Sequence, residues 1–172
     1  EALRVAKERF GTAAAGLHQE TSPAALAPGW QLVLDPESSA GAHLVGTSGE
    51  SAFTFAFEGR GIALVTQRGP DQGRVLVEID GATPEGLRTD DAGRTYLDLE
   101  SDHPRVQAAL PLARGLAEGR HELTLTPEGS SPVIVDAILV GEGASPIAFY
   151  ALWALCSLLV VGGAVLWWRT SG

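Results

Sequence analysis

The residues of this chain that could carry chemistry are a short run of carboxylates. Asp98, Glu100 and Asp102 alternate along one face of an extended segment, and carboxylate oxygens are the ligands that Ca²⁺ prefers. One interpretation is therefore a calcium site. The other is a solvated face of an edge strand, where negative charge discourages pairing with a second sheet.

Recognised signatures of catalysis are missing from the sequence. His18, His43, His103 and His121 lack the HExxH spacing of a zinc enzyme, and the single cysteine, Cys156, lies in an apolar stretch. There is no GxSxG elbow and no Gly-rich phosphate loop between a strand and a helix. We therefore expect a protein that is not an enzyme, holds no cofactor, and carries its histidines on the surface or in turns.

The sequence contains two regions that could position such side chains, a long apolar segment and a strand-rich region. Residues 147–168 contain 22 consecutive residues without a charge, a length that spans about 33 Å as a helix and predicts a transmembrane segment. The residues that would anchor it at the membrane interfaces are Tyr150, Trp153, Trp167, Trp168 and Arg169. A face of mostly small side chains, on which another helix could pack, comprises Ala154, Ser157, Val161, Gly162 and Ala164.

Charge predicts the orientation and location of the chain. Arg169 is the only charge after the apolar segment, so the positive-inside rule places the tail, residues 169–172, in the cytoplasm and the large domain outside. One Lys, eleven Arg and no Asn suggest GC-rich codons. We expect a single-pass protein of a bacterial cytoplasmic (inner) membrane with a periplasmic or extracellular domain, whose export signal would precede residue 1. Nucleic acid is not an expected partner, because the net charge is −9.

Residues 29–142 show the period-two pattern of β-strands separated by turn residues. Phe53, Phe55 and Phe57 share one strand face and should form core. Asp136 should accept backbone hydrogen bonds or point outward. The pattern indicates an all-β, antiparallel sandwich or barrel, with strands over residues 30–34, 43–47, 51–57, 62–67, 75–79, 96–100, 106–112, 121–126 and 133–140.

The flanking regions have different patterns. Residues 1–28 form an N-terminal arm in which apolar residues of the first 20 positions recur near helical spacing, followed by a linker rich in Pro and Ala. Residues 82–93 read as a polar loop, and residues 143–146 as a connector too short to hold the domain far from a membrane.

Several segments together resemble the galactose-binding-like jelly-roll modules of bacterial surface and secreted proteins. They are FTFAFEGRGIALV, VLVEIDG, TYLDLES, GLAEGRHELTLTPEG and VIVDAILV. The resemblance covers residues 29–142 and implies a jelly-roll β-sandwich, often carbohydrate-binding, with a binding or scaffolding role. Because such modules bind sugars on aromatic platforms, it also implies Trp30 and Tyr96 as candidate ligand residues.

Two functions remain open from the sequence. The first is a non-enzymatic, single-pass subunit whose sandwich helps to assemble or stabilise a larger bacterial membrane complex, such as a photosynthetic or respiratory one. Its partners would be other membrane subunits and the lipid bilayer. The alternative is a membrane-anchored carbohydrate-binding surface module, whose partner would be a glycan.

Overall fold

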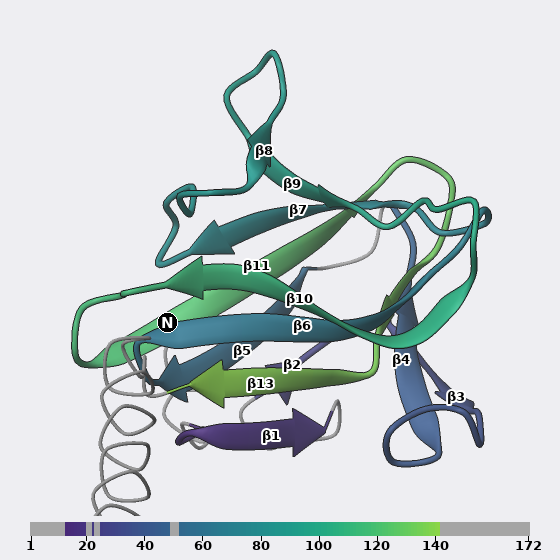
Figure 1. The fold of residues 1–172 in the computed structure, drawn as a ribbon, viewed down its shortest axis with the longest axis horizontal. Coiled ribbons are helices and arrows are strands. Elements are labelled where there is room, and N and C mark those ends of the chain that lie inside the picture. The colour runs from purple at the N-terminus through teal and green to yellow at the C-terminus, as the bar shows by residue number, and fades with distance from the viewer. Residues whose placement is uncertain (1–12, 20–21, 23–24, 49–51, 142–172) are drawn as a thin grey trace, which may run out of the picture. The chain divides into compact units, whose positions relative to one another are not determined.

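The computed structural model describes residues 13–19, 22, 25–48 and 52–141, which form β-strands joined by turns (Figure 1). No helix in this part of the chain is long and apolar enough to cross a membrane. The predicted membrane segment, 147–168, lies outside the described residues, together with its anchor and packing residues, the connector 143–146 and the tail 169–172. The membrane anchor therefore stays a prediction.

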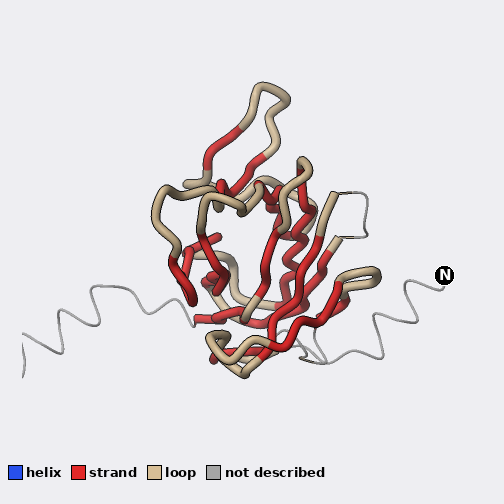
Figure 2. Tube along the Cα trace, turned by 90° about the vertical axis from the view of Figure 1, so that its right-hand side faces the viewer, coloured by secondary structure: helices blue, strands red, loops and turns tan. Residues whose placement is uncertain are grey.

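Within the described residues, two antiparallel sheets lie on two sides of a common interior (Figures 1 and 2). The larger sheet has the order β2 (Ala25–Leu26), β5 (Phe53–Glu58), β11 (Arg120–Glu128), β7 (Arg74–Ile79), β9 (Thr95–Asp98) and β8 (Arg88–Thr89). The second has the order β1 (Gly16–Gln19), β13 (Ala137–Gly141), β6 (Gly61–Arg68) and β10 (Arg105–Arg114). A small third sheet comprises β12 (Val133–Val135), β4 (Ala42–Gly46) and β3 (Gln31–Leu34). This arrangement confirms the all-β antiparallel class and agrees with a β-sandwich.

The core is built from the strand faces that alternate inward. Phe53, Phe55 and Phe57 of β5 have no exposed surface, as predicted. Leu64 of β6 and Ile138 of β13 belong to the same buried cluster, although they come from the second sheet. Full burial of each such side chain stabilises the fold by about 1.5–3 kcal/mol. The two sheets thus share one hydrophobic core.

Strand β10 forms one edge of the second sheet, and its pairing with β6 is irregular. The register shifts between Arg105 and Ala108 and again between Pro111 and Ala113. Such a bulge inserts an extra residue into one strand, so that two successive side chains, Leu112 and Ala113, are both buried. Pro111 offers no backbone N–H. This edge is therefore poorly suited to pairing with a further strand.

Asp136 separates two strands that the sequence predicted as one. Its carboxylate is only 1% exposed and accepts hydrogen bonds from the backbone N–H of Ser39 at 2.9 and 3.1 Å and from the Ser39 hydroxyl at 2.7 Å. The Asp136 N–H donates to the Val65 carbonyl at 3.0 Å. The prediction that Asp136 accepts backbone hydrogen bonds is confirmed.

Three short strands differ from the sequence expectations. Residues 16–19, expected within a partly helical arm, form β1 because they pair with the free edge of β13. Residues 25–26, expected in a linker, pair with β5. Residues 88–89, expected in a polar loop, pair with β9. Each is fixed by a partner strand distant in sequence, which outweighs the local spacing of apolar residues.

Candidate functional site

An open hollow lies near the edges of the two sheets and brings together polar and apolar side chains. Its volume is about 490 Å³. That is in the range of about 300–1,000 Å³ typical of small-molecule sites. The lining comes from the end of β6, from β8 and the loop before it, from β9 and the segment after it, and from β10. It comprises Arg68, Gly86, Leu87, Arg88, Tyr96, Leu97, Asp98, Glu100 and Leu110.

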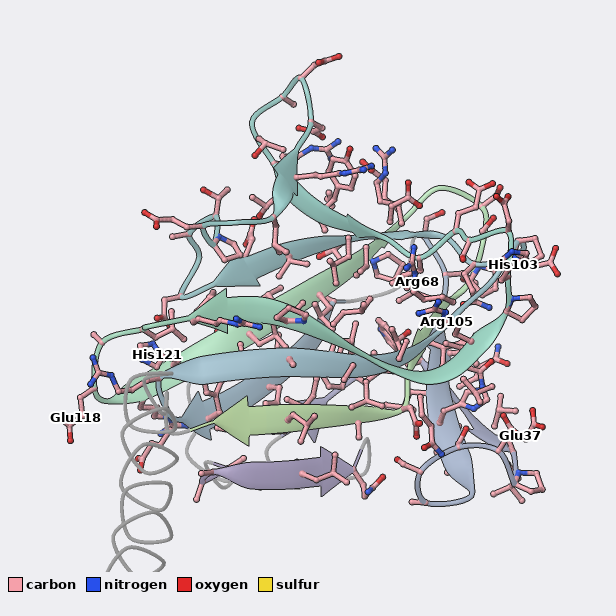
Figure 3. The ribbon with its side chains drawn as sticks, in the orientation of Figure 1. Glu37, Arg68, His103, Arg105, Glu118 and His121 are labelled. Atoms are coloured by element: carbon pink, nitrogen blue, oxygen red, sulfur yellow. The ribbon has the colours of Figure 1, made fainter. Side chains whose placement is uncertain are left out.

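Arg68 is the last residue of β6, and its guanidinium is held at the wall of the hollow. One Nη2–H donates to the Glu100 carbonyl at 3.1 Å. The Nε atom is buried and has no hydrogen-bond partner within the described part of the protein. Arg105 of β10 is the direct cross-strand neighbour of Arg68, and Figure 3 shows the two side chains at the same end of the domain. Opposed like charges are unfavourable, so this end favours a ligand that accepts hydrogen bonds.

Tyr96 is the aromatic residue in the lining of the hollow. Its neighbour Thr95 is buried, and the Thr95 hydroxyl donates to the Val77 carbonyl at 2.6 Å, which ties β9 to β7. The Arg74 guanidinium carbon lies 4.1 Å from the centre of the Tyr96 ring, a cation–π contact. The ring therefore lies on the same face of the sheet as Arg74 of β7, and Tyr96 is one of the residues that line the hollow. Its role as a ligand platform stays a prediction.

The β8–β9 hairpin that carries Arg88 and Tyr96 is locked at its turn. Asp90 accepts hydrogen bonds from the backbone N–H groups of Ala92 and Arg94 and from Arg94 Nε. The first cause of the lowered Asp90 pKa is the hydrogen bond from the Arg94 backbone. Arg94 also reaches Glu128 of β11 at 2.6 Å, and hydrogen bonds to Asp90 and then Glu128 raise its pKa. Arg94 therefore links the hairpin turn to the adjoining strands of the larger sheet.

The structure does not gather the predicted calcium ligands into one group. Asp98 and Glu100 line the hollow, but Asp102 does not. Asp98 Oδ1 instead accepts the Glu100 backbone N–H at 3.2 Å. Over the described ranges no three His, Cys, Asp or Glu side chains are placed to hold a metal ion. The two carboxylates in the hollow are thus available as hydrogen-bond acceptors.

Trp30 is not an exposed platform, so that part of the prediction was wrong. It is 8% exposed and its ring lies 5.7 Å from the Phe53 ring. A Cβ atom added to Gly46 would lie 2.6 Å from the indole carbons. The indole therefore packs directly against the backbone of β4, which needs glycine at that position.

Two of the four histidines also depart from the expected surface or turn positions. His43 and His121 are 5% and 8% exposed. Ser38 Oγ and Asp35 Oδ2 lie 2.7 and 3.5 Å from the same His43 atom, Nδ1. A Ser-His-Asp relay needs the serine and the aspartate on different ring nitrogens. The cluster is therefore a structural network, in which the Glu37 backbone N–H is the first cause of the lowered Asp35 pKa.

A second open hollow adjoins the first. Its volume is about 380 Å³, and its lining comprises Glu85, Gly86, Leu87, Pro111, Leu112, Ala113 and Arg114. Gly86 and Leu87 line both hollows. Sequence analysis missed Arg68, Arg88 and Arg114, because only the strand pairing places these arginines along one groove.

No protein-family model matches this chain, and no curated protein sequence matches it. Solved structures do match. A crystal structure of exo-β-1,3-galactanase from Phanerochaete chrysosporium with β-1,3-galactotriose gives a TM-score of 0.53 at 13% identity over 76% of this chain and 30% of that one. A two-domain esterase active on acetylated mannans, co-crystallised with mannopentaose, gives a TM-score of 0.52 at 14% identity over 72% of this chain and 36% of that one. A family 35 carbohydrate binding module from Clostridium thermocellum gives a TM-score of 0.47 at 13% identity over 73% of this chain and 98% of that one.

The present chain spans about a third of the length of the galactanase and of the esterase. At these identities the likeness is one of fold. The chain shares an antiparallel β-sandwich with parts of carbohydrate-active proteins. This agrees, at the level of fold, with the resemblance to galactose-binding-like modules.

Proposed function

We propose that this chain is a non-enzymatic glycan-binding module, a jelly-roll sandwich that binds sugar in the hollow beside Tyr96. The observation that carries the proposal is the composition of the lining: one tyrosine and three leucines beside two arginines, an aspartate and a glutamate. A sugar offers apolar C–H faces that pack on aromatic and aliphatic groups, and hydroxyls that donate and accept hydrogen bonds. The lining supplies a counterpart for each of these features.

The lining also makes glycan a better ligand than an isolated ion. Arg68 and Arg88 are donors only, whereas the carboxylates of Asp98 and Glu100 are acceptors only. No ion pair is recorded between these four side chains and any described residue. Donors and acceptors that remain available around one hollow suit a neutral ligand with many hydroxyls.

A glycan array probed with the purified full chain tests this proposal. We expect saturable binding to at least one glycan, loss of that signal in Tyr96→Ala, and retention in Tyr96→Phe, which keeps the ring. Arg120→Ala is a matched control, because Arg120 is exposed and lines neither hollow. If the protein is folded by circular dichroism and binds none of the glycans on the array, the proposal is contradicted.

A second candidate is a subunit of a larger membrane complex, anchored through residues 147–168. It is favoured by apolar side chains on the outer side of the second sheet, where cross-strand partners Leu17 and Leu139 are 51% and 37% exposed. Leu34 of edge strand β3 is 82% exposed. Contiguous exposed apolar surface is typical of protein–protein interaction sites, and the adjacent pair Leu17 and Leu139 supports this candidate on that ground.

Native gel electrophoresis after mild detergent extraction tests the second candidate. Migration with other subunits is expected, and Leu17→Ser with Leu139→Ser should release the chain from them. Migration at the mass of a monomer would count against it.

A further inference from the structure

The two hollows form one groove along β10. They share Gly86 and Leu87, and their other linings follow one another along the strand, with Leu110 in the first and Pro111 to Arg114 in the second. Both are open to solvent. Each is already in the size range of a small-molecule site of about 300–1,000 Å³, so the groove exceeds what one sugar unit would fill.

The two parts of the groove are lined by side chains of the same kinds. Arg68 and Glu100 line its first part, and Arg114 and Glu85 line its second part. Leu87 is the apolar side chain that the two linings share, next to Gly86. This places hydrogen-bonding groups in both hollows, with an apolar surface common to them, which suits a ligand that repeats hydroxyl-bearing units along its length.

A peptide added as a further strand fits this edge poorly. Strand addition needs a regular ladder of backbone N–H and C=O groups. In β10 that ladder is interrupted by two register shifts and by Pro111, and Gln107 has a positive φ of 52°. The side chains of the groove, and not the backbone edge, are therefore the recognition surface.

We propose that this groove binds several consecutive units of a glycan chain lying along β10, with Arg68 serving the first hollow and Arg114 the second. The inference rests on the proposed glycan-binding function and extends it from a sugar to the interior of a polysaccharide.

Calorimetric titration of the full chain with manno-, β-1,3-galacto- and cello-oligosaccharides of one to six units tests the inference. For the series that binds, we expect affinity to rise at least about tenfold between two and five units, since 1.4 kcal/mol corresponds to a factor of ten. Arg114→Ala should weaken the five-unit ligand about tenfold and the two-unit ligand less than about twofold, because only the longer ligand reaches the second hollow and loses a charged hydrogen bond there. Arg68→Ala should weaken both, and Arg120→Ala neither.

The outcomes separate the two proposals. Equal affinity for two-unit and five-unit ligands, or an Arg114→Ala effect that does not depend on length, would overturn the extended groove and leave glycan binding intact. If folded wild-type protein binds none of the oligosaccharides and none of the glycans on the array, both glycan binding and the extended groove are overturned.

Discussion

The pair formed by His121 and Asp80 should make stability depend on pH in a defined direction. His121 Nδ1 lies 2.7 Å from Asp80 Oδ2, and His121 Nε2 lies 2.9 Å from the Ala117 carbonyl oxygen. Both partners can only accept hydrogen bonds, whereas neutral imidazole has a single N–H. The geometry therefore favours the imidazolium, and the pKa of His121 is raised, first by the hydrogen bond to Asp80.

The direction of this pH dependence follows from the linkage between proton binding and folding. Because the pKa of His121 in the folded protein is above its ordinary value of 6.5, the pair stabilises the fold fully below about pH 6.5. That contribution is lost as pH rises through the folded pKa. Hydrogen bonds to charged groups contribute about 1.5–3 kcal/mol. The Asp80 side chain is 48% exposed, so solvent screening reduces the expected value to about 1–2 kcal/mol.

Asp80→Asn is the appropriate perturbation. Asp80 has a positive φ of 55°, which asparagine also tolerates, so the turn is kept while the charge is removed. Urea unfolding followed by circular dichroism should show a loss of about 1–2 kcal/mol at pH 5.5 and a clearly smaller loss at pH 8.5. Asp71→Asn, in another exposed turn, is the control. An equal loss at both pH values, or a larger one at pH 8.5, would refute the reasoning.

Four substitutions at three positions test the packing and one buried hydrogen-bond network by the same unfolding measurement. Phe55→Ala empties a completely buried position and should cost about 3–5 kcal/mol; a cost below about 1 kcal/mol would contradict the shared core. Gly46→Ala places a methyl group 2.6 Å from the Trp30 ring and should cost about 1–3 kcal/mol; an unchanged or raised stability would show that the indole can move away. Asp136→Ala leaves the Ser39 N–H without its carboxylate partner and should cost about 1–3 kcal/mol of unfolding free energy. Asp136→Asn keeps an acceptor oxygen and should cost less. Equal costs for the two substitutions would argue that the hydrogen bond from the Ser39 N–H is unimportant.

The strands of the core could be predicted because their pattern is local. The alternation of Phe53, Phe55 and Phe57 shows in the sequence which face of β5 is buried, and the structure confirms it. Strands β1 and β8 could not be predicted in this way, because four and two residues carry too little periodicity and depend on partners far along the chain.

The candidate site was predicted only in part for the same reason. Tyr96 stood out as one of few aromatic residues in the domain, but so did Trp30, and sequence does not show which of the two is covered by core. The approach of Arg68 to Arg105 depends on a register across a bulged pair of strands. Nothing local to either residue in the sequence indicates that pairing.

Nuclear magnetic resonance of the isotopically labelled full chain, titrated with the glycan that gives the strongest array signal, tests the central claim most directly. The account predicts that amide shifts concentrate at Arg68, at residues 86–88, at residues 96–98 and at Glu100, which line the hollow. Saturable shifts concentrated elsewhere, such as at β3 or at the exposed Leu17 and Leu139, or no shifts at all, would contradict it.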